Sequence, residues 1–321
     1  MSQAQSEEGL KNQDGFRCGY AALVGRPNAG KSTLLNQLLG SKLAITSPKP
    51  QTTRNRIVGV ASEDGMQAIL VDTPGIHEAW TELNKQMVHA ARTSIADVDV
   101  ALWLGDMSVL WRRIESQEPI FDAVDDEIIA LLANSNRKVI FVANKIDLVP
   151  SPFILPVIDE VRHRLSVEAA IPVSALTGDG IRPLLDGLRS LLPVHPALYP
   201  ADHWTSVSER FLVAEAVREK VFQLTEEEIP YSTAVEVVRF DESERESKKI
   251  VRILADIVVE RTSQKGILIG KGGEMLKRIG TLARKDIEAL LGCRVYLELF
   301  VKVEREWTRT ANGLRRAGFE S

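Results

Sequence analysis

Residues 25–33 read GRPNAGKST, and this stretch decides how the first half of the chain folds. The spacing of Gly25, four residues, Gly30, Lys31 and Ser32 is that of a phosphate-binding loop, whose backbone N–H groups approach phosphates. Such a loop needs a strand before it and a helix after it. The flanking YAALVG and KSTLLNQLLG have these patterns. We therefore expect Lys31 to reach the terminal phosphates of a nucleotide and the Ser32 hydroxyl to bind Mg²⁺.

Short apolar runs recur between Arg17 and Leu192, and each ends in a polar or glycine-containing stretch. They read YAALVG, QAILVDT, VDVALWLG, KVIFVANK and AAIPVSAL. Continuous apolar strands that alternate with helical patterns are typical of a parallel sheet buried on both faces. Such sheets bind their ligands at the carboxyl ends of the strands. The polar residues that follow each run are therefore the candidates for a site.

Three further motifs follow these strands in order. DTPG at residues 72–75 places the Asp72 carboxylate where it can hold the Mg²⁺ shell and the Gly75 N–H where it can meet a γ-phosphate. NKID at residues 144–147 and SAL at residues 174–176 follow the last two apolar runs. Because each motif stands at a strand end, a nucleotide site is favoured over an isolated glycine-rich turn.

The carboxylate of Asp147 indicates which base is bound. It can accept hydrogen bonds from both the N1–H and the exocyclic amine of guanine, whereas adenine presents an unprotonated N1 there. A site built on such polar pairing rejects the wrong ligand by a factor of about 10⁴ to 10⁵. The sequence therefore favours GTP over ATP, with GDP as the product.

These motifs, with SPKPQTTRNRI at residues 47–57 between the first and the second, resemble the Era family of small GTPases. The resemblance extends over nearly the whole chain from Arg17 onward. It implies an α/β fold, a P-loop GTPase domain with a mostly parallel sheet, followed by an α+β KH domain of type II. It also implies that the Thr53 hydroxyl joins the Mg²⁺ shell, with Thr52 as the alternative, and that the stem of Lys145 packs along the base.

The motifs and the resemblance together define the candidate nucleotide site. Catalysis is assigned to Lys31, Thr53 and Gly75, and the metal ligands are Ser32, Thr53 and Asp72. The cofactor-binding residues are Gly25, Asn28, Ala29, Gly30, Lys31, Ser32, Thr33, Asp72, Thr73, Pro74, Gly75, Asn144, Lys145, Asp147, Ser174, Ala175 and Leu176.

The residue after DTPG bears on the rate of hydrolysis. Ras-like GTPases place a water-orienting glutamine there, whereas this chain has Ile76, which can neither donate nor accept a hydrogen bond. We therefore expect slow intrinsic turnover. The resemblance further suggests that Asn28 helps to hold K⁺ as a source of positive charge, and the alternative is that Asn28 only stabilises the loop turn.

Charge is sharply divided in the second half of the chain. Residues 225–247 carry eight acidic and two basic side chains, and residues 248–285 carry ten basic and three acidic ones. In the basic stretch, GKGG at residues 270–273 lies between an apolar segment and an amphipathic helix, as in the loop with which a KH domain clamps about four nucleotides of RNA. The predicted RNA-binding residues are Ile269, Gly270, Lys271, Gly272, Gly273, Lys277, Arg278 and Arg284.

These features divide the chain into four parts. We predict a disordered leader at residues 1–16, a GTPase domain at 17–192, a linker with three prolines at 193–204, and a KH domain with a carboxyl-terminal tail at 205–321. Residues 106–124 are interpreted as a surface insertion, with a partner contact as the alternative. The tail is either an additional RNA contact or a packing helix.

Composition argues against secreted and membrane-spanning classes. The 321 residues carry a formal charge of −4 and two cysteines, too few for a disulfide framework, and contain no run of about 18 apolar residues. We expect a cytoplasmic monomer without a transmembrane segment. The resemblance adds peripheral contact with the cytoplasmic face of the membrane.

The leading hypothesis is a GTP-hydrolysing switch coupled to RNA binding. The resemblance implies a role in assembly of the small (30S) ribosomal subunit through binding of 16S rRNA near its 3′ end. The alternative is an RNA-binding protein in which GTP is a regulatory ligand with negligible turnover. Ile76 keeps this alternative open.

Overall fold

The computed structural model describes residues 15–47, 49, 52–54, 56–76, 89, 91–310 and 313. Contacts divide them into two compact units. The first unit holds the described residues up to Leu43 and those from Arg56 to Ser206, and the second holds those within 44–54 and from Val207 onward. The predicted leader, except its last two residues, and most of the carboxyl-terminal tail lie outside the described residues.

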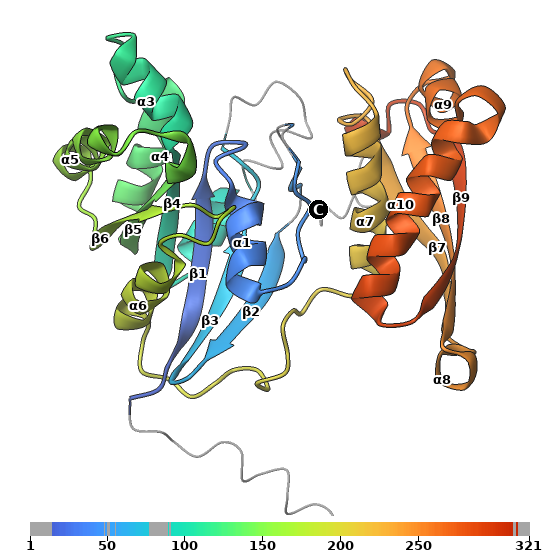
Figure 1. The fold of residues 1–321 in the computed structure, drawn as a ribbon, viewed down its shortest axis with the longest axis horizontal. Coiled ribbons are helices and arrows are strands. Elements are labelled where there is room, and N and C mark those ends of the chain that lie inside the picture. Colours follow the sequence, from blue (N-terminus) through green and yellow to red (C-terminus); the bar gives the residue numbers. More distant parts are fainter. Residues whose placement is uncertain are drawn as a thin grey trace, which may run out of the picture. The chain divides into compact units, whose positions relative to one another are not determined.

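The first unit is built on a six-stranded sheet with helices on both faces (Figure 1). The strand order is β2-β3-β1-β4-β5-β6, and every neighbouring pair is parallel except β2 with β3. The predicted mostly parallel sheet is therefore confirmed. The elements of this unit are β1 (Arg17–Gly25), α1 (Lys31–Leu39), β2 (Ile57–Glu63), β3 (Met66–Asp72), β4 (Val100–Asp106), α3 (Met107–Glu115), α4 (Ala123–Asn134), β5 (Lys138–Asn144), η2 (Ile146–Leu148), η3 (Ser151–Phe153), α5 (Ile154–Arg164), β6 (Ala169–Val173) and α6 (Ile181–Leu191).

The strands of this sheet read as continuous apolar runs because their side chains alternate between two cores. Trp103 of β4 and Phe141 of β5 pack with residues of α3, α4 and α5 on one face. On the other face α1 contacts β1 to β3, and α6 contacts β5 and β6. Ile140, which neighbours Phe141, accordingly points toward Gly187 of α6. This layering leaves the carboxyl edge of the strands to the loops that carry the motifs.

The stretch 106–124, predicted as a surface insertion, contributes to the core as well as to the surface. Met107, Leu110 and Phe121 are buried with the side chains of α4 and α5, whereas residues 115–119 are all exposed. The stretch is therefore partly core and partly surface, with its longest exposed run in the middle.

The predicted linker runs along the first unit, where backbone hydrogen bonds and one buried side chain hold it. Gln67 of β3 is 1% exposed. Its Oε1 accepts hydrogen bonds from the N–H groups of Leu198 and Tyr199 at 2.8 and 2.9 Å, and its Nε2 donates to the Tyr199 carbonyl at 2.9 Å. An antiparallel bridge between Gly59 and Thr205 then adds the chain to the edge of β2.

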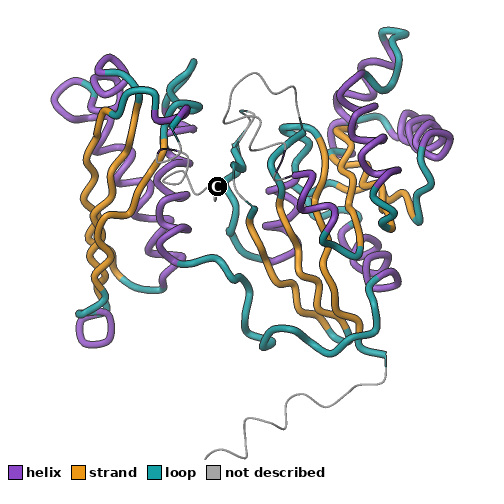
Figure 2. The backbone as a smooth tube through the Cα atoms, turned by 180° about the vertical axis from the view of Figure 1, so that it is seen from behind, coloured by secondary structure: helices purple, strands orange, loops and turns teal. Residues whose placement is uncertain are grey.

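The second unit is a three-stranded sheet with α7 and α10 on one face, as Figure 2 shows from behind. In the order β7-β8-β9, the first pair is antiparallel and the second is parallel. A parallel pair needs a crossover, and here it runs through α9, the GKGG loop and α10. The elements are α7 (Glu209–Leu224), β7 (Ala234–Asp241), α8 (Arg245–Lys248), β8 (Ile250–Val259), α9 (Thr262–Ile269), η4 (Lys271–Gly273), α10 (Glu274–Leu291), β9 (Arg294–Val303) and η5 (Trp307–Arg309).

Helix α9 corrects the sequence interpretation, which expected only an apolar segment before GKGG. The helix has eight residues and contains Gly266, so it has little of the periodicity that reveals longer helices. The side-chain oxygen of Gln264 accepts hydrogen bonds from the N–H groups of Glu260 and Arg261, each at 3.0 Å. This local capping, rather than an apolar stripe, starts the helix.

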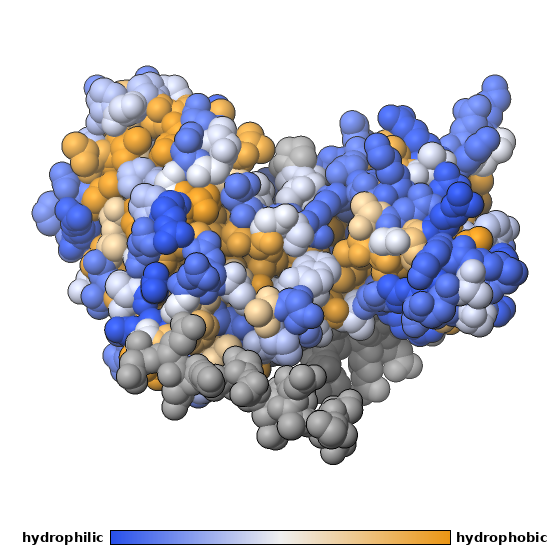
Figure 3. Space-filling model, turned by 60° about the horizontal axis from the view of Figure 1, so that its bottom comes forward, coloured by the Kyte–Doolittle hydropathy of each residue, from blue (hydrophilic) through white to orange (hydrophobic). Residues whose placement is uncertain are grey.

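Hydrophilic side chains predominate on the face of the second unit that Figure 3 brings forward (right). This view turns the region of α8 toward the reader, where the sequence DESERESKKI is almost entirely charged or polar. Among the described residues, no helix combines the length and the apolar character needed to cross a membrane.

The Gln67 contacts predict that the linker depends on this side chain. We expect Gln67→Ala to lower the free energy of unfolding by about 1–3 kcal/mol, because it leaves partly buried backbone groups of the linker without this partner. Amide hydrogen exchange at Leu198 and Tyr199 should accelerate. Urea unfolding and hydrogen exchange measure both effects. Ser62→Ala removes a single side-chain contact to Gln67 and should have the smaller effect, and unchanged exchange at both amides in Gln67→Ala contradicts the interpretation.

Candidate nucleotide and RNA sites

The loop between β1 and α1 has the geometry of a phosphate cradle. Asn28 and Gly30 both have positive φ, 63° and 94°, and α1 begins directly after Gly30 without a side-chain cap. A helix that begins in this way directs its N–H groups and the positive end of its dipole toward the loop. A Cβ at Gly30 would lie 2.3 Å from the Asn144 side chain, so only glycine fits there.

Lys31 is held at the centre of this loop. Its side chain is buried, and its Nζ donates to the carbonyls of Gly25 at 3.1 Å and Arg26 at 2.8 Å. Burial lowers the pKa of the Lys31 ammonium to about 8, in spite of the nearby negative charge of Asp72. Phosphate oxygens at this loop favour the charged form of the lysine. The side chain therefore lies within the loop, and its contact with the terminal phosphates stays a prediction.

Two of the three predicted metal ligands lie together. The Ser32 hydroxyl donates to Asp72 Oδ2 at 2.7 Å, and Asp72 is fully buried at the end of β3. One hydroxyl and one carboxylate oxygen are the kind of ligands that Mg²⁺ takes beside nucleotide phosphates, so the pair fits the ion. Thr53 belongs to the second unit, and its role as a ligand stays a prediction.

The DTPG loop packs directly on the phosphate-binding loop. The Ile76 N–H donates to the Gly25 carbonyl at 3.2 Å, and a Cβ at Gly75 would lie 2.7 Å from the backbone nitrogen of Pro27. The Ile76 side chain is 1% exposed within the core of the first unit. A buried apolar side chain cannot orient an attacking water, and slow hydrolysis stays a prediction.

Asn144 joins three of the predicted loops. Its Nδ2 donates to the Ala29 carbonyl at 2.7 Å, and its Oδ1 accepts from the Ala175 N–H at 3.0 Å. Asn144 is 1% exposed, so both amide groups are used within the protein. The side chain therefore connects the NKID motif to the phosphate-binding loop and to the SAL motif.

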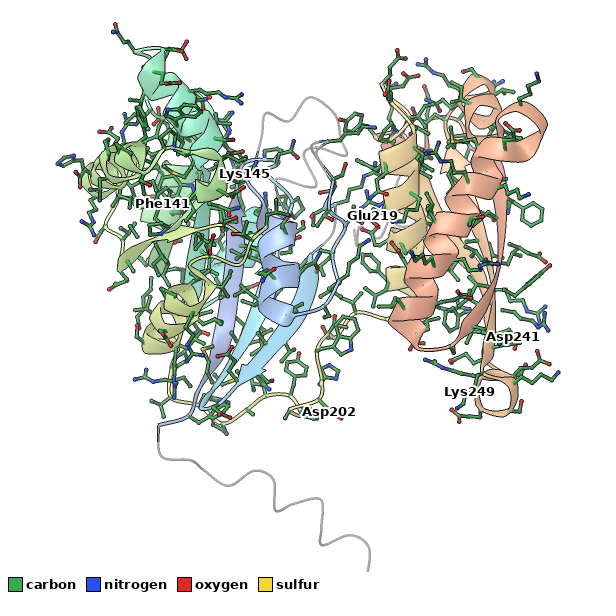
Figure 4. The ribbon with its side chains drawn as sticks, in the orientation of Figure 1. Phe141, Lys145, Asp202, Glu219, Asp241 and Lys249 are labelled. Carbon is green, nitrogen blue, oxygen red and sulfur yellow. The ribbon has the colours of Figure 1, made fainter. Side chains whose placement is uncertain are left out.

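The base-reading end of the site is more open. Asp147 is exposed in the short helix η2, and Leu176 is 76% exposed in the neighbouring loop. Lys145, with φ 68°, forms an ion pair with Asp106 at 2.5 Å and lies at the end of β5 (Figure 4). The sequence analysis did not single out Asp106, although its position at the end of β4 is the signal that could have done so.

The predicted RNA loop lies between α9 and α10. Gly272 and Gly273 have φ of 60° and 84°, and a Cβ at either would meet no atom within 4 Å. At Gly270, with φ 72°, a Cβ would lie 2.9 Å from the backbone nitrogen of Met275. Glycine is therefore needed at these positions for backbone conformation, and at Gly270 for packing too. The loop presents open backbone to a ligand at Gly272.

Basic side chains lie in this loop and along α10. All of them are exposed, and none forms an ion pair with another of the residues that the structure describes. A row of such cations next to an uncapped helix start suits a phosphate backbone. They are Lys271, Lys277, Arg278, Arg284 and Lys285.

The described residues within 44–54, hereafter the 44–54 segment, pack along α7 in the second unit. The Thr46 N–H donates to Glu219 Oε1 at 3.2 Å, and Glu219 projects from α7 in Figure 4. Arg218 donates to the Thr52 carbonyl. Lys49 Nζ donates to two carbonyls at the carboxyl end of α7, where the helix dipole favours a cation.

Arg54 fastens the end of the 44–54 segment. Its side chain is 3% exposed, and its guanidinium donates to the carbonyls of Thr233 at 2.7 Å and of Pro230 and Tyr231 at 2.9 Å each. The same guanidinium lies over the Phe222 ring, 5.8 Å from its centroid. A buried cation with three carbonyl partners holds the segment firmly, because leaving any of these groups unpaired is costly.

Comparisons with known proteins agree with this geometry. A family model for 50S ribosome-binding GTPases matches residues 20–145, and a KH-domain model matches residues 228–308. The chain is 47% identical over 304 residues to GTPase Era of Geobacter metallireducens, which covers 95% of this chain and 98% of that protein. This chain belongs to the Era family of GTPases. A second relative, GTPase Era of Geobacter sp. strain M21, is 50% identical over 305 residues, again 95% of this chain and 98% of the relative.

Two solved Era structures share the fold of this chain over 94% of its length and 99% of theirs. The first is a single-residue variant of Aquifex aeolicus Era bound to GDP·AlF4⁻, with a TM-score of 0.87 and 40% identity. The second is Era in complex with MgGDPNP and nucleotides 1506–1542 of 16S ribosomal RNA, with a TM-score of 0.87 and 39% identity. The Era fold, a GTPase domain followed by a KH domain, is thus shown for this chain, and the chain is a GTPase.

The base-reading assignment predicts that nucleotide specificity can be switched at Asp147. We expect Asp147→Asn to shift the ratio of GDP to XDP affinity toward XDP by a factor of about 10⁴. The amide oxygen still accepts from the base N1–H, while its NH₂ group faces the guanine amine unfavourably and the xanthine carbonyl favourably. Equilibrium titration with fluorescent GDP and XDP measures the ratio.

Asp159→Asn removes the same charge from an exposed position on α5 and is the matched control. It should leave the ratio unchanged. If Asp147→Asn also leaves the ratio unchanged, the carboxylate does not read the base.

Proposed function

We propose that this Era-family GTPase is a nucleotide-controlled RNA-binding switch that acts in small-subunit (30S) assembly. Its RNA target is 16S rRNA near the 3′ end. The observation that carries the proposal is the open, positive-φ GKGG loop flanked by exposed cations in a chain that also carries a GTPase domain. The related Era bound to nucleotides 1506–1542 of 16S rRNA supports the choice of RNA.

Hydrolysis depends on charge stabilisation rather than on a protein base. Lys31 is positioned by two carbonyls for the terminal phosphates, and the Gly75 N–H is proposed to meet the γ-phosphate. Mg²⁺, held by Ser32, Asp72 and, as proposed, Thr53, supplies further positive charge when bound. Because Ile76 cannot orient water, we expect GTP turnover to be slow until a bound partner such as the RNA stimulates it.

The switch acts through the 44–54 segment, which connects α1 of the first unit to β2 in the sequence and packs on α7 of the second. Ordering of Thr53 at a bound nucleotide requires this segment to take a defined position. A change in that position alters the contacts of α7, and α7 packs on α10, which carries the RNA-binding cations. These contacts all lie within the second unit, and the proposed binding of Thr53 to Mg²⁺ is the step by which nucleotide state acts on them.

The remaining parts of the proposal rest on the family resemblance alone. They are a K⁺ ion held with the help of Asn28, action in the cytoplasm as a monomer, and peripheral contact with the cytoplasmic face of the membrane. Equal GTP turnover in KCl and NaCl would show that K⁺ does not assist hydrolysis.

The RNA part of the proposal is tested at Gly272. We expect Gly272→Asp to weaken binding of a 16S 3′-end oligonucleotide at least about tenfold, because a carboxylate then faces the phosphates. Stimulation of GTP hydrolysis by the RNA should be lost, while hydrolysis without RNA stays the same. Fluorescence anisotropy and single-turnover assays measure the two effects.

Gly292→Asp is the matched control. Gly292 ends α10 with φ 63° and, like Gly272, has no atom within 4 Å of the point that a Cβ would occupy. The same backbone strain is thus introduced away from the loop. Equal RNA affinity of the wild type and Gly272→Asp would overturn the RNA clamp, and undetectable hydrolysis under all conditions would favour the regulatory-ligand alternative.

A further inference from the structure

Arg26 lies inside the phosphate-binding loop, and its carbonyl accepts hydrogen bonds from other residues of the loop. Its carbonyl accepts from Lys31 Nζ at 2.8 Å and from the Ala29 N–H at 3.3 Å. The preceding carbonyl, of Gly25, accepts from Lys31 and from the Ile76 N–H. Any displacement of the Arg26 backbone therefore moves the acceptors that position Lys31 and the DTPG loop.

The Arg26 side chain points away from this cradle and forms ion pairs with the start of α4. Its Nη1 lies 2.5 Å from Asp122 Oδ1 and 3.1 Å from Asp125 Oδ2. These two carboxylates are also the capping box of α4, in which Asp122 accepts from the Val124 and Asp125 N–H groups. The partner of Arg26 is therefore a helix start with a fixed position in the first unit.

A second arginine binds the same two carboxylates from another direction. Arg113 of α3 forms ion pairs with Asp122 and, at 3.0 Å, with Asp125, and it donates to the Ile120 carbonyl. The Asp125 side chain is 5% exposed, so its charge needs partners. With two arginines present, the loss of either one leaves each carboxylate with a cation.

We infer that Arg26 is a positioning residue that fastens the phosphate-binding loop to α4 and so preorganises it for the nucleotide. The side chain does not touch the reacting phosphates. It acts through the Gly25 and Arg26 carbonyls and lowers the entropy that the loop loses on binding. Arg113 supports the same carboxylates, but its bonds go to α4 and to the Ile120 carbonyl rather than to the loop, so it does not share this role.

Replacement of each arginine by glutamine separates this role from mere support of α4. We expect Arg26→Gln to speed release of a fluorescent GDP by about fivefold to tenfold with an unchanged association rate. Arg113→Gln should change release less than about twofold, although both variants remove one cation from the same carboxylates. Stopped-flow binding on the full-length protein gives both rate constants.

Two further variants keep the test decisive. Arg26→Lys retains the cation and should give an intermediate rate of GDP release. Asp122→Asn added to Arg26→Gln should speed release no further, because the two substitutions remove the same contact. The relative affinity for GDP and XDP should stay at the wild-type value in all of them, since the base is read elsewhere. Equal release rates in Arg26→Gln and Arg113→Gln, or no acceleration in Arg26→Gln, would overturn the inference.

Discussion

The nucleotide site depends on the hydrogen bonds of one buried amide. Asn144 donates to the Ala29 carbonyl and accepts from the Ala175 N–H, and so it holds the phosphate-binding loop, the NKID motif and the SAL motif in one arrangement. A parallel sheet brings the ends of its strands to one edge, but it does not by itself fix the loops that follow them. The Asn144 side chain fixes these loops, and it fits beside Gly30 because glycine has no Cβ. Affinity for guanine and affinity for phosphate are thereby linked through a shared set of loops.

A second constraint acts on the chain between α1 and β2. The 44–54 segment contains the proposed magnesium ligand Thr53, and its contacts are with α7 and the 230–233 turn of the second unit. Arg54 is buried with three carbonyl partners, so a change in the position of the segment alters these hydrogen bonds to the second unit. We therefore expect both nucleotide binding and the packing of the KH unit to depend on the 44–54 segment. This shared use is the physical basis of the proposed switch.

The motifs that depend on residues close together in the sequence were predicted. The phosphate-binding loop, DTPG and GKGG depend on glycines and on neighbouring strands and helices, and the structure has these motifs at the expected element ends. Features that depend on distant partners could not be predicted. The Arg26 and Arg113 ion pairs need α3 and α4 folded together, and the docking of the linker depends in part on the amide of Gln67. Helix α9 was missed because a capped eight-residue helix with an internal glycine has almost no periodic signal.

The central claim is that GTP and RNA are coupled through the 44–54 segment. Its most direct measurement is the affinity of a 16S 3′-end oligonucleotide for the protein loaded with GDP and with a non-hydrolysable GTP analogue, in the wild type and in Arg54→Ala. We expect the two nucleotide states of the wild type to differ at least about fivefold in RNA affinity, and Arg54→Ala to bring them close to equality. Equal RNA affinity in both states of the wild type, or a difference that persists in Arg54→Ala, would contradict it.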